Sequence, residues 1–330
     1  MGERIRVDAD QSNIIRWMSF FAIACVVLGH CRIGNDAVQR IIYGTFCQWH
    51  VPFFYFVSGI FLYVSLNNNS WSSILLKKFQ TNVVPYFLWC LIPMMLKGKL
   101  GLAYTIDEIF AFSKPAPCGN PHLWYLHCLI VFIGVTMLIW KILAFLPQFT
   151  RRILFGVIFI IFFLFVEFLG IKTLYGTPTS PFYFLSGFIF APSFLASKIK
   201  KSAWCVLIII AITSKIIWLV LAPRGFFEII MRVLCVYSGI FSVYGALFEL
   251  TKRKWLPKFS SLLQPVFFVY CSHGLLLPIC RYVCADVFEI PTTWIGMIVL
   301  SILVLLLSFG IANIVKKMNA SVYEFLSGGR

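Results

Sequence analysis

The stretch that decides the fold is TTWIGMIVLSILVLLLSFGIANI, residues 292–314, in which no position carries a charged side chain. About 20 apolar residues in a helix are enough to cross the hydrocarbon core of a bilayer. A helix also satisfies its own backbone hydrogen bonds, which lipid cannot do. This run therefore predicts a membrane-spanning helix.

The same pattern recurs throughout the chain. Nine further apolar runs fall at about 14–33, 45–66, 83–99, 121–146, 153–170, 179–196, 203–222, 227–248 and 261–284. No internal repeat or linker divides them. The sequence therefore predicts an all-α fold, a polytopic membrane helical bundle with about ten transmembrane helices. It also predicts a single integral membrane domain over residues 1–330.

The composition excludes an ordinary soluble domain. Hydrophobic residues make up 60% of the chain and charged residues 12%, whereas soluble domains carry about 25% charged residues. The formal net charge of +16 would suggest a nucleic-acid partner in a soluble protein. In a membrane protein it reflects the excess of Lys and Arg on cytoplasmic loops. We therefore expect membrane lipids, and no nucleic acid, as partners.

The distribution of the basic residues predicts the orientation. The densest basic clusters are Lys77–Lys78, Arg151–Arg152, Lys198–Lys201 and Lys252–Lys258. They fall on connections that share one side if the N-terminus is cytoplasmic, and most other basic residues agree. Both termini are then cytoplasmic, which requires an even number of spans.

Ionisable side chains within spans are costly and therefore mark candidate sites. The five histidines are His30, His50, His122, His127 and His273. The first four fall at the predicted outer ends of spans, where imidazole, indole and phenol groups also gather as an interfacial belt. No metal-ligand spacing such as HExxH is present, so the sequence predicts no metal site.

His30 shares a helical stripe with two other polar residues. At 100° per residue, Ser19 lies about 20° and Arg16 about 40° from His30 around the helix axis. The stripe runs about 21 Å from the predicted cytoplasmic boundary outward. An anion could bind at Arg16, unless this residue is only an interfacial anchor, and His30 could act as a general base.

Several segments resemble, in order, the acyltransferase-3 family of bacterial membrane proteins. They are WMSFFAIACVVLGH (17–30), VPFFYFVSG (51–59), LKKFQTNVVPYFLW (76–89), HLWYLHCLI (122–130), FYFLSGF (182–188), FFVYCSH (267–273) and VYEFLSGGR (322–330). Each string is weak alone, but together they cover nearly the whole chain.

The resemblance implies an O-acyltransferase of the bacterial inner membrane. Such an enzyme moves an acyl group, usually acetyl, from cytoplasmic acyl-CoA to a sugar hydroxyl of a cell-envelope polysaccharide or glycolipid. CoA is a co-substrate, and no bound cofactor is implied. The family's functional histidine corresponds to His30. Its arginine, 11 residues earlier, falls on Ser19 here, so we expect Arg16 to take its place.

The remaining site residues are assigned by position. We expect Arg16, Ser19, Lys77 and Lys78 to bind the donor. We expect His127, Trp124 and Tyr125 to face the acceptor, although the aromatic residues also fit an interfacial belt. The resemblance implies the same for His273, which matches a recurrent position of the family. The sequence leaves open whether His30 acts as base or nucleophile. It also leaves open two other functions, a glycan exporter or flippase and an inactive family member.

Overall fold

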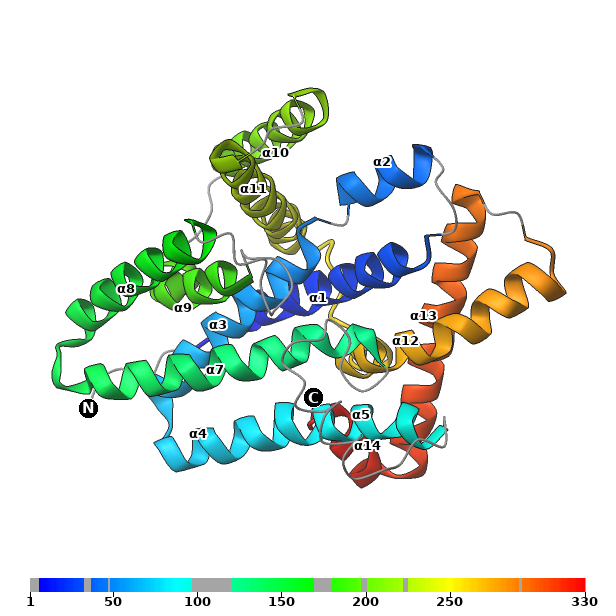
Figure 1. The fold of residues 1–330 in the computed structure, drawn as a ribbon, viewed down its shortest axis with the longest axis horizontal. Coiled ribbons are helices and arrows are strands. Elements are labelled where there is room, and N and C mark those ends of the chain that lie inside the picture. Colours follow the sequence, from blue (N-terminus) through cyan, green and yellow to red (C-terminus); the bar gives the residue numbers. More distant parts are fainter. Residues whose placement is uncertain are drawn as a thin grey trace.

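The computed structural model describes residues 6–32, 37–46, 48–96, 120–168, 180–196, 201–221, 225–290 and 293–329. Within these residues every regular element is a helix (Figure 1), so the predicted all-α class is confirmed. The helices are α1 (Ala9–His30), α2 (Ala37–Phe46), α3 (His50–Asn68), α4 (Trp71–Lys78), α5 (Val84–Leu96), α7 (Trp124–Ile142), α8 (Gln148–Phe168), α9 (Ser180–Ala196), α10 (Lys201–Leu221), α11 (Gly225–Lys252), α12 (Val266–Tyr282), α13 (Trp294–Met318) and α14 (Ala320–Ser327).

The chain is a multi-pass membrane protein. In its described part, 7 helical stretches are long and apolar enough to span: Ala9–His30, His50–Asn68, Trp71–Leu96, Trp124–Phe145, Phe227–Lys252, Val266–Val287 and Trp294–Met318. Shorter apolar stretches cover Pro181–Ala196 and Cys205–Ile217. Each of the ten predicted runs overlaps a described helix, while the count of ten spans stays a prediction.

The third span is longer than predicted, and the predicted loop before it is wrong. Lys77 and Lys78 close α4 rather than lie in a loop, and the π-helical turn η1 (Phe79–Val83) continues α4 directly into α5. Hydropathy placed the start of the third span after the lysines because charge is costly in lipid. Their long aliphatic stems let them continue a helix at a membrane boundary.

Two other boundaries follow from local capping. Helix α1 begins at Ala9, before the predicted residue 14, because the Asp8 carboxylate accepts from the Gln11 backbone N–H at 2.6 Å. Helix α12 begins at Val266, after the predicted residue 261, because Pro265 precedes it and residues Ser261–Leu263 form a separate 3-10 turn.

Close packing of α3 on α9 depends on two glycines. A Cβ on Gly59 would overlap the Phe184 backbone, and a Cβ on Gly187 would overlap the Phe56 backbone. Small residues at such positions let membrane helices approach backbone to backbone. The two glycines therefore set the distance between these helices.

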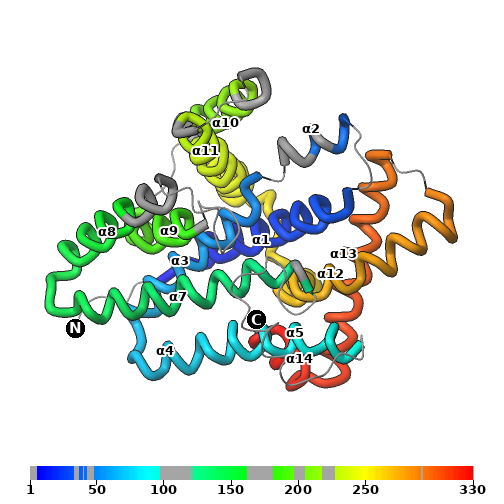
Figure 2. The backbone as a smooth tube through the Cα atoms, viewed as in Figure 1, coloured from blue at the N-terminus to red at the C-terminus, as the bar shows by residue number. Residues whose placement is uncertain are grey.

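Helix α12 occupies the position that matters for function. It packs against α1, α13, the α14 tail and the turn η3 (Pro121–Leu123) that precedes α7. Figure 2 shows it beside the ends of α1 and α7, while α10 and α11 lie together elsewhere. Elements far apart in sequence therefore meet around α12.

Candidate functional site

His30 is the last residue of α1 and its side chain is exposed. The chain leaves the helix directly after it, with the Cys31 N–H bonded to the carbonyls of Val27 and Leu28. Arg281 of α12 donates to the His30 carbonyl at 3.4 Å. A cation at the C-terminus of a helix is favourable, so this contact also ties the end of α1 to α12.

His122 lies in the turn η3 and is held by its backbone. The Asn120 side-chain oxygen accepts from the His122 N–H at 3.3 Å, while the Asn120 amide donates to the Cys271 carbonyl at 3.3 Å. The Tyr270 hydroxyl donates to the His122 carbonyl at 2.6 Å. Helix α12 thus fixes the turn that presents this imidazole.

His273 is buried in α12, with 1% of its surface exposed. Its Nδ1 lies 2.6 Å from the Tyr270 carbonyl and 3.2 Å from the Val269 carbonyl. A carbonyl oxygen only accepts, so Nδ1 carries the proton and Nε2 has a free lone pair. That Nε2 is buried and has no hydrogen-bond partner.

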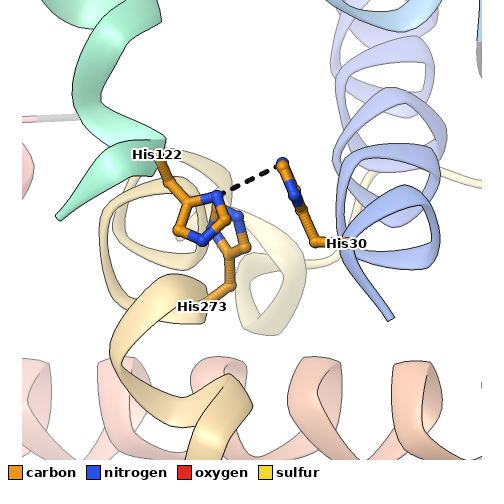
Figure 3. A group of neighbouring side chains, drawn as sticks. All are labelled: His30, His122 and His273. Atoms are coloured by element: carbon orange, nitrogen blue, oxygen red, sulfur yellow. Dashed lines mark hydrogen bonds between the residues drawn. The ribbon is translucent and has the colours of Figure 1, made fainter. Parts of the chain in front are cut away.

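The three imidazoles converge on one point, as Figure 3 shows. The Nδ1 of His122 lies 3.2 Å from the Nε2 of His30. Ring centroids are 4.1 Å apart for His30 and His122, 4.6 Å for His122 and His273, and 5.4 Å for His30 and His273. One nitrogen from each ring lies within 4.8 Å of the other two. These three residues are called the histidine cluster below.

Gly274 makes room for the cluster. A Cβ at this position would overlap the His122 ring and press on the Asn120 side chain. The residue after His273 must therefore be glycine for His122 to pack directly on the α12 backbone.

His122 is uncharged near neutral pH. No Asp or Glu of the described residues joins the cluster. His122 precedes the membrane span that starts at Trp124, and burial, followed by the nearby His30 ring, lowers its pKa to about 4. A neutral imidazole offers one lone pair and one N–H, so the cluster can accept protons or ligate a metal.

The predicted stripe on α1 is not an open path. Arg16 is exposed, and the Ser19 hydroxyl donates to the Ile15 carbonyl of its own helix at 2.8 Å. Ile23, midway between Arg16 and His30, is 0% exposed. Packed apolar atoms therefore separate the predicted donor end of the stripe from His30.

The other residues predicted to face the acceptor lie outside the cluster. The His127 ring stacks on Tyr86 with centroids 5.5 Å apart. The Tyr125 ring packs on Tyr55 at 4.5 Å and its hydroxyl lies 3.4 Å from that of Ser58. Trp124 packs against the hydrophobic core. Of the four predicted acceptor residues, the structure brings only His273 to His30.

Lys77 borders a separate cavity of about 610 Å³. The cavity lies between α4, η1 and the C-terminal tail, and it is lined by Ser73, Leu76, Lys77, Gln80, Thr81, Val84, Ser321, Glu324, Phe325, Gly328 and Gly329. Lys78 is half-buried, and its carbonyl accepts from Asn82. The paired lysines therefore differ, and only Lys77 lines the cavity.

His122 was missed by sequence reasoning. Its place at the predicted outer end of a span suited an interfacial role equally well. The signal that could have found it is the His273-Gly274 pair, because a glycine after a mid-span histidine indicates a close neighbour. That signal still does not say which residue the neighbour is.

A family model described as an acyltransferase domain matches residues 13–313. No curated protein and no solved structure matches the chain. The matched range covers nearly the whole chain and includes His30, His122 and His273.

Proposed function

This chain belongs to the acyltransferase-3 family, and we propose that it moves an acyl group from acyl-CoA to a sugar hydroxyl of a cell-envelope polysaccharide or glycolipid. The acyl group in this proposal is acetyl, and the membrane is the bacterial inner membrane. The observation that carries the proposal is the convergence of His30, His122 and His273, three imidazoles from three separate segments.

The exposed member of the cluster gives the acceptor access. His30 is exposed, His122 is half-buried and His273 is buried. A sugar hydroxyl can therefore reach His30 first, while His122 and His273 support the His30 ring from the buried side. Neutral imidazole is the side chain best suited to accept a proton near pH 7.

The cavity beside Lys77 is the proposed donor site. Its volume of about 610 Å³ is within the usual range of ligand sites, about 300–1,000 Å³. A lysine at its edge suits the phosphates of CoA. Arg16 remains a proposed second contact for the donor.

Helix α12 links the two sites. Phe268 stacks on Tyr323 of the tail, with centroids 6.2 Å apart, and Tyr323 precedes the cavity-lining Glu324. His273 follows Phe268 by five residues, a rise of about 7.5 Å along the helix. A thioester arm that extends from the cavity along α12 would therefore approach the cluster.

The chemical step balances without a further reactant. The acceptor hydroxyl gives its proton to the cluster as its oxygen attacks the thioester carbonyl. The new C–O bond forms, the C–S bond breaks, and the departing CoA thiolate takes the proton. The Nε2 of His30 then returns to its hydrogen bond with His122, and the products are an O-acyl sugar and free CoA.

Isotope-labelled acetyl-CoA tests this function. Membranes that contain the wild-type chain receive the labelled donor and a cell-envelope glycan extract, and label in the glycan is measured with free CoA. We expect incorporation in the wild type and loss in His30→Ala at equal expression. A parallel Arg16→Ala variant tests whether this residue contributes to donor use.

Two results would count against the proposal. Wild-type membranes that transfer neither acetyl nor longer acyl groups would favour the exporter or inactive-relative alternative. Full transfer by His30→Ala would place the chemistry away from the histidine cluster.

A further inference from the structure

The buried Nε2 of His273 lacks a hydrogen-bond donor. Its lone pair is fixed because Nδ1–H donates to the Tyr270 carbonyl at 2.6 Å. The contact between His30 and His122 satisfies one nitrogen of each of those rings and leaves His273 Nε2 without a partner. A buried polar atom left in this state costs free energy, about 1–3 kcal/mol, and so indicates that something else binds there.

The spacing of the nitrogens fits a metal ion. Zinc–nitrogen bonds of about 2.0–2.1 Å in a tetrahedron place two ligand nitrogens about 3.3–3.4 Å apart. The distance from His122 Nδ1 to His30 Nε2 is 3.2 Å, and all three ligand atoms lie within 4.8 Å of one another. The longest edge must shorten by at most about 1.5 Å to reach this spacing.

The surroundings of the cluster also match a metal site. Metal-bound histidines usually donate their other N–H to a carbonyl or carboxylate, which fixes the ring and its tautomer. His273 makes this contact with Tyr270. His122 is fixed through its backbone by Asn120 and Tyr270. Its ring packs directly on the backbone of Gly274, where a Cβ would overlap it.

We propose that His30, His122 and His273 bind one divalent transition-metal ion of the zinc class. Three neutral imidazole ligands suit zinc and leave a fourth position open, the arrangement of a catalytic zinc site. Binding of the ion does not depend on the proposed function, but its use in catalysis does.

In the loaded protein the acceptor hydroxyl would take the open position. Coordination lowers the pKa of a bound hydroxyl, so the oxygen could attack the thioester without a free imidazole base. The ion would supply a Lewis acid for the same bond changes, with the hydroxyl proton passing to the CoA thiolate. His30 would then act as one of the ligands that hold the ion, so its loss would still abolish transfer.

The experiment measures metal content directly. The full chain is purified in detergent through a tag without histidine, and its metal is measured by mass spectrometry against protein concentration. The chelator-treated protein is then titrated with Co²⁺, whose visible absorption reports tetrahedral coordination. We expect about one ion per chain and a matching cobalt endpoint.

Variants place the ion within the chain. His122→Ala and His273→Ala should each lose at least tenfold in metal affinity, since losing a ligand costs no less than losing an outer-shell partner, about 10–100-fold. His127→Ala is the matched control. His127 lies in α7, directly after the turn η3 that carries His122, but its ring stacks on Tyr86 outside the cluster, so this variant should keep the ion.

Each outcome is decisive. A wild-type chain that carries no metal and takes up no Co²⁺ overturns the inference without reference to any variant. Equal metal in His122→Ala, His273→Ala and wild type also overturns it, because the ion then lies elsewhere. Acyl transfer by metal-free protein overturns the use of the ion in catalysis but keeps the proposed function, whereas metal binding without transfer keeps the metal site but overturns the proposed function.

Discussion

The Nδ1 of His122 lies 3.2 Å from the Nε2 of His30, although 92 positions separate these residues in the sequence. Helix α12 makes the contact possible. It holds the end of α1 through Arg281 and the turn before α7 through Tyr270, and it supplies His273 itself. The cluster is therefore one unit, and its members should respond to mutation as a unit.

A double-mutant cycle tests this coupling. His30→Ala should lower acyl transfer by about 10²–10⁴-fold, the usual loss for a group that moves a proton. His122→Ala should lower it by about 10–100-fold, because His122 orients and supports His30. The double variant should be no slower than His30→Ala, since residues that act together are not additive. Initial rates of label incorporation give all four values.

Expression and unfolding temperature in detergent are the controls for this cycle. Multiplicative losses in the double variant would mean that the two rings act independently, and the cluster would then not be a single catalytic unit.

Gly274→Ala should disable the cluster without removing any of its polar groups. The new methyl group would overlap the His122 ring, and a displacement of about 1 Å at a reacting group can cost about 10²-fold in rate. We expect at least tenfold slower transfer with normal expression. Gly134→Ala on α7 is the matched control, because its Cβ would meet no atom within 4 Å. Equal rates for both variants would show that His122 tolerates the shift.

Hydropathy was enough to predict a helix in each of the ten apolar runs, because lipid imposes one strong rule on every span. It was weaker where a charge sits at a boundary. By sequence, Lys77 and Lys78 lie in the connection before the third span, yet they continue as helix through η1 into α5. The cost of a boundary lysine depends on where its stem points, and one sequence does not contain that information.

The site was predicted only in part. His30 was found because it shares a helical stripe with Arg16 and Ser19 and matches the family's functional histidine, and His273 because it matches a recurrent position of the family. His122 was not, because Asn120 and His122 are held by tertiary packing on Tyr270, Cys271 and Gly274, in a segment about 150 residues away. The predicted stripe from Arg16 to His30 followed helix geometry correctly but could not show that Ile23 would be fully buried.

Lys77→Glu should weaken donor use while leaving the chemical step intact. Lys77 lines the cavity of about 610 Å³, and an exposed charge contact is worth about 0.2–1 kcal/mol. Reversing the charge should raise the KM for acetyl-CoA by about three- to tenfold, with less difference at high salt and an unchanged kcat. Lys252→Glu, on an exposed residue at the end of α11, is the control. An unchanged KM in Lys77→Glu would exclude this cavity as the phosphate site.

Gly59→Ala should loosen the scaffold rather than the site. Its methyl group would overlap the Phe184 backbone carbonyl on α9, and a backbone cannot rotate away as a side chain can. Forcing one extra carbon into a packed contact costs about 1–3 kcal/mol, so thermal unfolding in detergent should begin at a lower temperature.

Gly187→Ala should behave alike, because its methyl group would overlap the Phe56 backbone across the same contact. The double variant should cost less than the sum of the two, since one separation of α3 from α9 relieves both overlaps. Gly310→Ala, whose Cβ would meet no atom within 4 Å, should unfold no earlier than wild type, and a similar loss there would mean that the contact between α3 and α9 is not the cause.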